Sequence, residues 1–347
     1  MMSQYAATDI GPPHYWDKMP EMCQKNYGQW DYHEKIKPGV LKHVGPNGAL
    51  WSIRVGSPLL LSIESLRWFA ALADKYCDGH FRFTTRAAIE FMTPNEENVD
   101  KIIEEVEAYG FPVGGTGNSL RNLLHTQGWV HCHSAATDAS GTVKAVMDDL
   151  YDYFKRDDLP AQIKISMACC LNMCGAVHCS DISFVGIHRT LPRVIDEEVA
   201  NQCEIPNLVA SCPVGAIRPN PRKKSVTIDE KRCMYCGNCF SVCPAVPIAN
   251  PDADGIAIFV GGKVSNTRKG PSFSKLVVPY IPNEPPRWPT LVKTIRNLVQ
   301  VWMDGARPGE RYGEWVERIG WEKFFELTGL EFTDKHIDDF TFSVKTF

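Results

Sequence analysis

The sequence has no long uninterrupted apolar run. The nearest approach is residues 57–61 (SPLLL), and Glu64 and Arg67 follow them closely. A membrane-spanning helix needs about 18 or more such residues, so membrane insertion is not expected. The first 13 residues also lack the basic and then apolar layout of a secretory signal. We therefore expect a soluble, cytoplasmic protein.

An excess of basic charge is also absent. The chain has 37 lysines and arginines against 41 aspartates and glutamates, which gives a formal net charge of −4. General nucleic-acid binders are usually strongly basic, so that class is excluded. The glycine-rich segment at 114–117 lacks the third glycine and the acidic residue at the spacing of a dinucleotide-binding fingerprint.

Cysteine, by contrast, is abundant. At roughly 150 residues per domain, the 347 residues are enough for two to three domains. The 44% of hydrophobic residues is ordinary and sufficient for a sizeable core. In a chain expected to be cytoplasmic, 13 cysteines predict metal or redox ligands rather than a framework of disulfides.

Three of these cysteines lie close together in the segment MACCLNMCG at 167–175. Thiolates are soft ligands that suit iron–sulfur clusters, zinc and copper(I). A cubane 4Fe–4S cluster takes four thiolates, so this segment needs a fourth, and Cys132 is the best upstream candidate. The alternative is that Cys169 and Cys170 are small buried hydrophobic residues. A second group of cysteines further along the chain makes that interpretation the weaker one.

The second group follows the bacterial ferredoxin pattern C-x2-C-x2-C-x3-C-P at 233–244. In that pattern the last cysteine ligates the other cluster of a two-cluster module. Only Cys203 remains as a spare thiol nearby, so we predict one cluster, with Cys243 either structural or a substitute ligand. A zinc ribbon is the weaker alternative, because zinc sites usually show two separated Cys-x2-Cys pairs or histidine partners. The predicted ligands are Cys212, Cys233, Cys236 and Cys239.

The patterns around these groups predict an α+β fold. Residues 49–55 alternate as a strand, and Ser62 can cap the helix that follows. Residues 79–91 predict two short strands around a basic bend, and residues 99–106 predict a second helix that ends at Gly110.

Two further elements lead into the first cysteine group. Residues 143–154 predict an amphipathic helix, and residues 161–167 alternate as a strand. Cys169 and Cys170 therefore lie just past a strand end, which is a common place for ligand sites.

The two cysteine groups and their surroundings resemble one family. The segments HTQGW at 125–129 and CCLNMCG at 169–175, with the inserted ferredoxin run, are similar to beta subunits of dissimilatory sulfite reductases over essentially the whole chain. The resemblance implies an α+β fold of sirohaem sulfite/nitrite reductase-like two-layer units with an inserted bacterial ferredoxin domain. The expected domains are an N-terminal arm at 1–48, a ferredoxin-like α+β half-domain at 49–122, a sirohaem and 4Fe–4S-binding domain at 123–202 and 258–347, and the ferredoxin domain at 203–257.

The resemblance also implies the cofactors and the reaction. A sirohaem is expected to be coupled to one 4Fe–4S cluster, with a second 4Fe–4S cluster in the ferredoxin domain as an electron relay. The expected reaction is the six-electron interconversion of sulfite and sulfide, with Cys174 bridging the coupled cluster to the sirohaem iron. The ligands of the coupled cluster are then Cys132, Cys169, Cys170 and Cys174.

Cations are expected around the sulfite oxyanion and the sirohaem carboxylates. In the superfamily, arginines near a Thr-x-Arg bend and a Lys-x-Lys pair bind the anion, but Gln162 replaces one lysine of that pair here. We therefore expect most anion ligands to come from an alpha subunit. Solvated surface cations remain the alternative for each candidate. The candidates are Arg82, Arg86, Lys164, Arg268 and Lys269.

The resemblance implies two protein partners: an alpha subunit in an α2β2 heterotetramer and a small cysteine-bearing sulfur-carrier protein. His125, His131 and His133 flank Cys132 and could deliver protons, although a structural role is favoured for each. Two other functions stay open, an electron-transfer subunit and a sirohaem nitrite reductase. The Cys-Cys-x3-Cys pattern and the ferredoxin insertion favour sulfite, while the physiological direction stays open.

Overall fold

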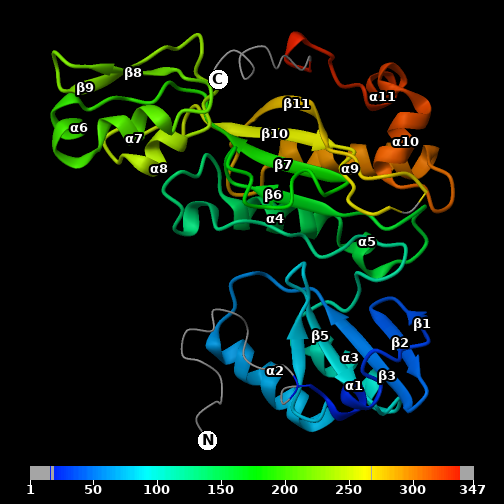
Figure 1. Cartoon of the computed structure of the whole chain (residues 1–347). Coiled ribbons are helices and arrows are strands. Elements are labelled where there is room, and N and C mark those ends of the chain that lie inside the picture. The colour runs from blue at the N-terminus through cyan, green and yellow to red at the C-terminus, as the bar shows by residue number, and fades with distance from the viewer. Residues whose placement is uncertain (1–15, 17–18, 267, 337–347) are drawn as a thin grey trace, which may run out of the picture. The chain divides into compact units, whose positions relative to one another are not determined.

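The computed structural model describes residues 16, 19–266 and 268–336 (Figure 1). The chain divides into two compact units, Met1–Asn122 with Lys155–Asp157, and Leu123–Phe154 with Asp158–Phe347. Residues 1–15 of the predicted arm and 337–347 of the predicted sirohaem-binding domain lie outside the described residues. Within the described part of the chain, no helix is both long and apolar enough to cross a bilayer.

The first unit is an antiparallel sheet with helices packed on it. Its strand order is β1-β2-β3-β5-β4, and α2 and α3 contribute to the same hydrophobic core as the central strands. The strands are β1 (Tyr32–Lys37), β2 (Val40–Gly45), β3 (Gly48–Val55), β4 (Phe81–Phe83) and β5 (Ile89–Thr93), and the helices are α1 (Glu21–Lys25), α2 (Ile63–Tyr76) and α3 (Asn98–Ala108).

The sequence predicted most of these elements. The predicted strand is β3, the two short strands are β4 and β5, and the second helix is α3. The Oγ atom of Ser62 accepts a hydrogen bond of 3.0 Å from the backbone N–H of Ser65 and so caps α2 as predicted. Ile53 and Phe91 on the sheet pack against Phe69 of α2, and all three are fully buried.

The prediction of an irregular arm at 1–48 is wrong for residues 32–48. These residues form β1 and β2, which pair as a hairpin at the edge of the sheet. The side chains of β1 are exposed along nearly its whole length, so this edge strand lacks the apolar alternation that marks a half-buried strand. Pro38 and Gly39, which suggested an irregular segment, form the two-residue turn of the hairpin, where Gly39 has a φ of +82°.

The second unit is built on a four-stranded sheet of order β11-β10-β7-β6, in which β6 and β7 are parallel. Its strands are β6 (Ile165–Ala168), β7 (Ile182–Ile187), β10 (Gly255–Val260) and β11 (Lys275–Pro282). Its helices are η2 (Gly128–Val130), α4 (Ala139–Asp149), α5 (Tyr151–Lys155), α9 (Pro289–Gly305), α10 (Tyr312–Ile319), α11 (Trp321–Thr328) and η3 (Asp334–His336).

Two elements of this unit differ from the prediction in their limits. The predicted strand at 161–167 is the shorter β6, which still ends directly before Cys169. The predicted single helix at 143–154 is two helices, α4 and α5, which are separated at Leu150. In the C-terminal helices Trp302 and Trp315 are fully buried in the core, whereas Trp321 is exposed.

A separate small module is inserted between β7 and β10 and lies beyond one end of their sheet (Figure 1). It consists of α6 (Asp196–Gln202), α7 (Ile205–Ala210), β8 (Ile217–Asn220), β9 (Ser225–Ile228) and α8 (Asn238–Val242). The predicted limits of 203–257 need correction at both ends. Val199 of α6 is buried in the core of the module, while Gly255 already pairs with Ile187 in the main sheet. The inserted module therefore spans residues 188–254.

Candidate iron–sulfur centres

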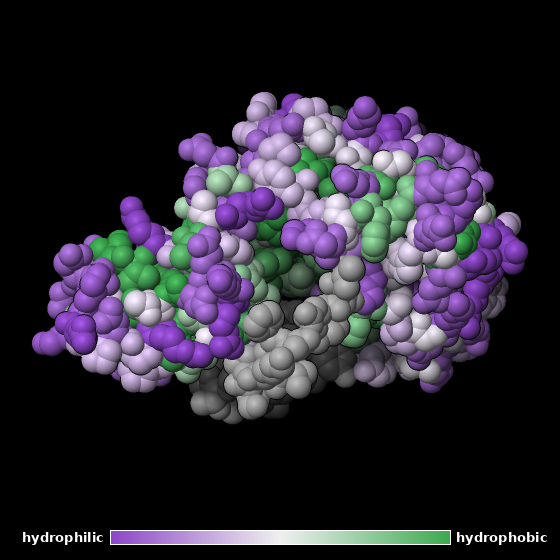
Figure 2. Space-filling model, turned by 90° about the horizontal axis from the view of Figure 1, so that it is seen from above, coloured by the Kyte–Doolittle hydropathy of each residue, from purple (hydrophilic) through white to green (hydrophobic). Residues whose placement is uncertain are grey.

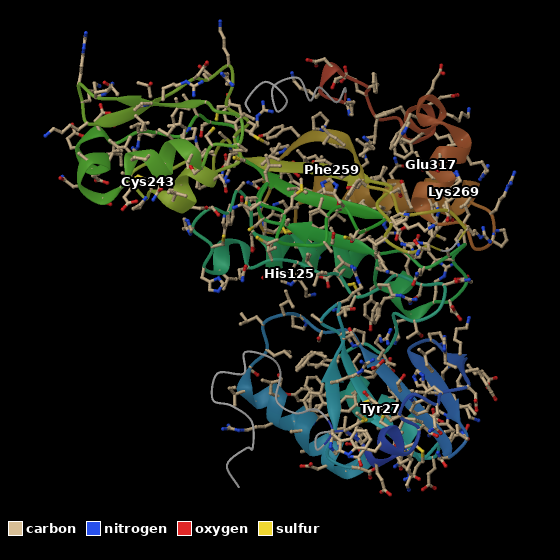
Figure 3. All side chains as sticks on the ribbon, viewed as in Figure 1. Tyr27, His125, Cys243, Phe259, Lys269 and Glu317 are labelled. Atoms are coloured by element: carbon tan, nitrogen blue, oxygen red, sulfur yellow. A yellow bond between two sulfur atoms is a disulfide. The ribbon has the colours of Figure 1, made fainter. Side chains whose placement is uncertain are left out.

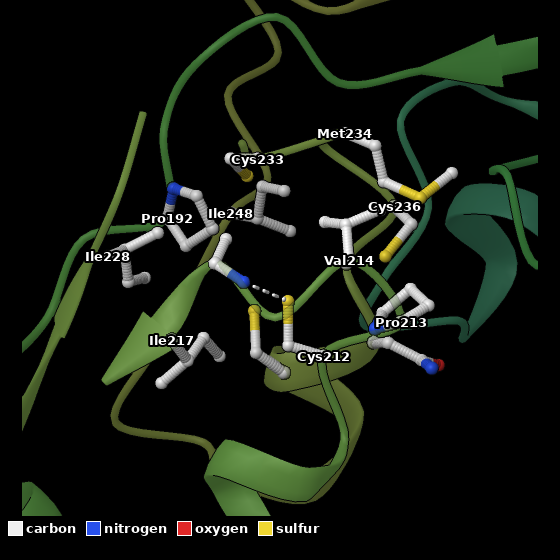
Figure 4. A pocket seen from close by; sticks show the side chains of 14 residues that line it. Pro192, Cys212, Pro213, Val214, Ile217, Ile228, Cys233, Met234, Cys236 and Ile248 are labelled. Atoms are coloured by element: carbon white, nitrogen blue, oxygen red, sulfur yellow. Dashed lines mark hydrogen bonds between the residues drawn. The ribbon is translucent and has the colours of Figure 1, made fainter. Parts of the chain in front are cut away.

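The inserted module contains a pocket lined by the four cysteines of the predicted ferredoxin site (Figure 4). Cys239 is buried and the other three are half-buried. Apolar side chains complete the lining, so a group bound here would be shielded from water. The structure thus brings these four cysteines together, and their binding of a cluster remains a prediction. The pocket is lined by Cys212, Cys233, Cys236, Cys239, Pro192, Val214, Ile217, Ile228, Met234 and Ile248, among others.

Burial affects the ionisation of these thiols. Burial raises the pKa of Cys233 and Cys236, and it raises the pKa of Cys239 to about 12. A metal replaces such protons when it binds the thiolates. The backbone N–H of Ala216 donates a hydrogen bond of 3.1 Å to the Sγ atom of Cys212 (Figure 4), an interaction that sets the potential of a cluster.

Cys243 is not part of this pocket. The structure joins it to Cys203 by a disulfide, and Cys243 is fully buried in the core of the module (Figure 3). Of the two roles left open by the sequence, the structural one is therefore confirmed. The disulfide itself was not predicted, because the sequence indicated no framework of disulfides and left Cys203 as a spare thiol. The two residues lie 40 positions apart, so no local spacing indicated the bond.

The second unit also gathers three of the four cysteines of the first group. The thiol of Cys169 is within hydrogen-bonding range of the thiols of Cys170 and Cys132. The Sγ atom of Cys132 lies 3.5 Å from the Oγ atom of Ser134. The bond from Cys170 lowers the pKa of Cys169, and the same bond together with burial raises the pKa of Cys170.

Backbone hydrogen bonds fix the two segments that carry these thiols. The N–H of Ala136 donates to the carbonyl oxygen of Cys169 at 2.8 Å, and the N–H of Cys169 donates to the Oγ1 atom of Thr126 at 3.0 Å. The end of β6 and the segment around Cys132 are therefore held as one structure.

Cys174 is exposed and follows a turn in which Met173 has a φ of +51°. Among the residues that the structure describes, no three His, Cys, Asp or Glu side chains converge as ligands of a single metal ion. Cys132, Cys169 and Cys170 are soft ligands gathered at one place, and their binding of a cluster remains a prediction.

Gly186 of β7 is required by this arrangement. A Cβ atom at this position would lie 2.1 Å from the carbonyl oxygen of Cys169. We expect Gly186→Ala to lower the free energy of unfolding by about 1–3 kcal/mol through overpacking, and to reduce the iron retained at the first group. Thermal unfolding and iron analysis test this. The control is Gly270→Ala, because no atom lies within 4 Å of the added carbon. Equal iron contents and equal unfolding temperatures in the two variants would contradict the requirement for glycine at position 186.

The predicted cations are distributed over both units. Arg82 and Arg86 belong to the first unit. Arg82 is ion-paired with the buried carboxylate of Glu90, which also binds Arg54. Burial raises the pKa of Glu90, but the two arginines outweigh burial and hold it below its usual range. The Nε atom of Arg86 donates to the carbonyl oxygen of Asn122 at 2.8 Å.

In the second unit, Arg268 and Lys269 bind groups of their own chain. The Nη2 atom of Arg268 donates to the carbonyl oxygen of Pro308 at 3.0 Å, and the Nζ atom of Lys269 lies 2.6 Å from Glu317 (Figure 3). An anion at Lys269 must therefore compete with this carboxylate.

Lys164 directly precedes β6, and its backbone N–H binds the carboxylate of a buried ion pair. Its N–H donates to the Oδ2 atom of Asp181 at 2.8 Å. Arg311 donates to both oxygens of Asp181, at 2.9 and 2.7 Å. Asp181 and Arg311 are 130 positions apart, so no sequence pattern indicated this pair.

We expect Arg311→Met to destabilise the second unit strongly, because it leaves the carboxylate of Asp181 buried without a partner. Breaking a buried pair in this way costs about 3–5 kcal/mol. Denaturant unfolding measures this loss. Lys323→Met, which removes an exposed pair with Glu326, should change little, and a similar small change for Arg311→Met would refute the role of the pair.

Of the three histidines near Cys132, His125 is buried and its Nδ1 atom lies 2.8 Å from the carbonyl oxygen of Thr126. Burial lowers its pKa, so it is neutral near pH 7, as suits a structural residue. His131 and His133 are exposed. A further buried pair, His188 with Asp254, was not predicted, because its members are 66 positions apart.

An α+β scaffold with a cysteine-lined ferredoxin-type pocket and a second group of cysteines is typical of iron–sulfur oxidoreductases. Comparison with known proteins gives the family. The family model described as the nitrite and sulphite reductase 4Fe-4S domain matches residues 116–336, and the nitrite/sulfite reductase ferredoxin-like half domain matches residues 43–109. The chain belongs to the nitrite and sulfite reductase family, and within it to the beta subunits of dissimilatory-type sulfite reductases.

The relatives that support this are similar over nearly the full chain. The beta subunits from Archaeoglobus fulgidus and Nitratidesulfovibrio vulgaris are each 52% identical, over 98% and 96% of this chain and 95% and 91% of their own. An alpha subunit from Allochromatium vinosum is 27% identical over 77% of this chain and 66% of its own. These relatives are sulfite reductase subunits, so the chain is an oxidoreductase subunit.

Solved structures confirm the predicted α+β fold. A crystal structure of dissimilatory sulfite reductase I superposes with a TM-score of 0.83 at 21% identity, over 91% of this chain and 81% of that chain. The NirA protein of Mycobacterium tuberculosis superposes with a TM-score of 0.53 at 15% identity, over 82% of this chain and 40% of that chain.

Proposed function

We propose that the chain supplies the cluster-binding part of a sulfite reductase that interconverts sulfite and sulfide with six electrons. The observation that carries the proposal is the presence of two separate cysteine groups in one unit, one lining the pocket of the inserted module and one beside β6. A reaction of six electrons needs a store of electrons near the substrate and a route of supply, and two clusters provide both.

The first cluster is assigned to Cys132, Cys169, Cys170 and Cys174. Three of these thiols converge and are held by backbone hydrogen bonds. Cys174 is exposed, so its sulfur can face a second group, and we assign it as the thiolate that bridges to a sirohaem iron. A sirohaem coupled in this way would supply electrons to the sulfur atom of sulfite. The axial ligand and the hydrogen bonds around it are the means by which the protein sets the potential.

The second cluster is assigned to Cys212, Cys233, Cys236 and Cys239. The apolar lining of their pocket excludes water, and the N–H of Ala216 stabilises a thiolate at Cys212. Hydrophobic residues also gather on the visible face of the inserted module (Figure 2), and its exposed apolar side chains include Met234 and Val242. In this proposal the module receives electrons and passes them on.

The cations are assigned to sirohaem carboxylates or to the oxyanion. The backbone of Lys164 is fixed, because its N–H donates a hydrogen bond to Asp181. Gln162 in place of a second lysine supports the proposal that an alpha subunit completes the anion site in an α2β2 assembly. A small cysteine-bearing sulfur-carrier protein is the proposed second partner. The assigned residues are Arg82, Arg86, Lys164, Arg268 and Lys269.

The test is turnover of the purified complex with its alpha subunit, with sulfite and nitrite compared at equal concentrations. We expect sulfide as the product and about six electrons consumed per sulfite, with slower reduction of nitrite. Preferential reduction of nitrite would favour a nitrite reductase. Absence of turnover with either anion, in a complex that still accepts and donates electrons, would favour an electron-transfer subunit.

A further inference from the structure

The two cysteine groups are connected by contacts between the residues that directly follow Cys132 and Cys239. The ring of His133, next to Cys132, lies edge-on to the ring of Phe240, next to Cys239, with centroids 5.0 Å apart and planes at 68°. One ring contact therefore links a predicted ligand of the first cluster to a predicted ligand of the second. Both residues belong to the same unit of the chain.

A second link lies beside the first and is buried. His188 follows directly after β7, and its side chain is inaccessible to solvent. Its Nε2 atom lies 3.1 Å from the carbonyl oxygen of Ser134, two residues after Cys132. A Cβ atom built on Gly237, between Cys236 and Cys239, would lie 3.6 Å from the same nitrogen. The imidazole thus binds the backbone of one cysteine segment and lies close to the other.

Both ring nitrogens of His188 have partners. The Nε2 atom faces the carbonyl oxygen of Ser134, and the Nδ1 atom lies 2.8 Å from Oδ2 of Asp254. The carboxylate of Asp254 also accepts from the N–H groups of Asn250 and Arg189, at 2.9 and 3.1 Å. The position of the imidazole is therefore fixed at both of its nitrogens.

The pair of His188 and Asp254 is anchored to the rest of the unit. The Nδ2 group of Asn283 donates to the carbonyl oxygens of both Ala136 and Asp254, each at 3.0 Å. Asn283 therefore joins the segment after Cys132 to the residue that binds His188. A buried polar group is costly to leave without its hydrogen bonds, so the imidazole is held in one position.

We propose that electrons cross between the two clusters through this junction, defined as His133, Ser134, His188, Gly237 and Phe240. The inference rests on the proposed function, because it assumes that both cysteine groups hold clusters. Each crossing is a one-electron transfer: the cluster of the inserted module is oxidised by one electron and the first cluster is reduced by one. No bond forms or breaks, and six crossings serve one sulfite. His188 is a positioning residue, which Asp254 fixes beside both cysteine segments.

The test uses the purified complex with both clusters loaded. Phe240→Leu removes the ring contact, and His188→Gln removes the imidazole that lies between Ser134 and Asp254. The control is Phe273→Leu, because Phe273 is exposed and contacts His178 rather than a cysteine segment. Iron and acid-labile sulfide are counted first. The clusters are then photoreduced, and freeze-quench electron paramagnetic resonance follows which cluster holds the electron.

We expect both junction variants to keep their iron but to slow inter-cluster transfer by about tenfold or more, as changes around the ligands of a metal commonly do. Electrons then accumulate on the cluster of the inserted module. The control should transfer at the wild-type rate.

Wild-type transfer rates in Phe240→Leu with both clusters intact would overturn the proposal, and so would a wild-type rate in His188→Gln with both clusters intact. If the His188→Gln complex loses a cluster, the transfer rate of the Phe240→Leu complex decides the test alone. Phe240 is joined by no assigned bond to the buried pair of His188 and Asp254. If the iron count of the wild-type complex shows fewer than two clusters, it is the proposed function that is contradicted. The two failures are therefore distinguishable.

Discussion

Cys174→Ala is expected to abolish sulfite reduction while leaving the cluster of the inserted module in place. Changes to groups that merely support a metal ligand already cost about 10–100-fold in activity, and Cys174 is assigned as a ligand and as the bridge to the sirohaem iron. Its position at the surface of the unit means that the substitution creates no cavity in the core. The loss should therefore appear in activity and in the spectrum of the coupled centre, and not in the stability of the fold.

The matched control for this prediction is Cys179→Ala. Cys179 is half-buried, lies in the same segment and is assigned to no cluster. Turnover and the electron paramagnetic resonance spectrum of each variant are compared in the purified complex. A Cys174→Ala enzyme with near wild-type turnover would refute the assignment of the bridging thiolate, whereas equal loss in both variants would point to general damage of the segment.

Cys236→Ala is expected to remove the cluster of the inserted module and to stop turnover with a protein electron donor. Burial raises the pKa of Cys236 in its pocket, so no solvent ligand readily takes the place of its sulfur. The fold of the module should persist, because its hydrophobic core and the disulfide between Cys203 and Cys243 do not depend on this side chain. The absorption of the coupled centre should stay.

Iron counts and turnover with two donors test this second prediction. A small chemical reductant that reaches the first cluster directly should restore part of the activity, while a protein donor should not. Cys23→Ala, in α1 of the first unit, is the control. Full turnover with a protein donor in the Cys236→Ala enzyme would show that electrons enter elsewhere.

The sequence predicted those parts of the fold whose signals are local. The alternation at β3, the cap at Ser62 and the strand end before Cys169 depend on neighbouring residues, and the structure has all of them. The exposed edge strand β1 has no such local signal, so it was predicted as an irregular arm. Its pairing with β2 comes from the backbone and from the turn at Pro38 and Gly39.

The same distinction applies to the site. The spacing of the ferredoxin run places Cys233, Cys236 and Cys239 around one pocket, and only Cys212 had to be found at a distance. The supporting pairs could not be predicted, because their members come from distant parts of the sequence. The pairs that local spacing could not indicate are Asp181 with Arg311, His188 with Asp254, and Cys203 with Cys243.

The central claim is that one chain holds a sirohaem-coupled cluster and a second cluster in its inserted module. The most direct test is an anaerobic visible spectrum with iron and acid-labile sulfide counts, on the chain copurified with its alpha subunit. We predict tetrapyrrole bands and iron for two cubanes, about eight cluster iron atoms per chain. Iron for a single cubane without tetrapyrrole bands would contradict the claim and leave an electron-transfer subunit.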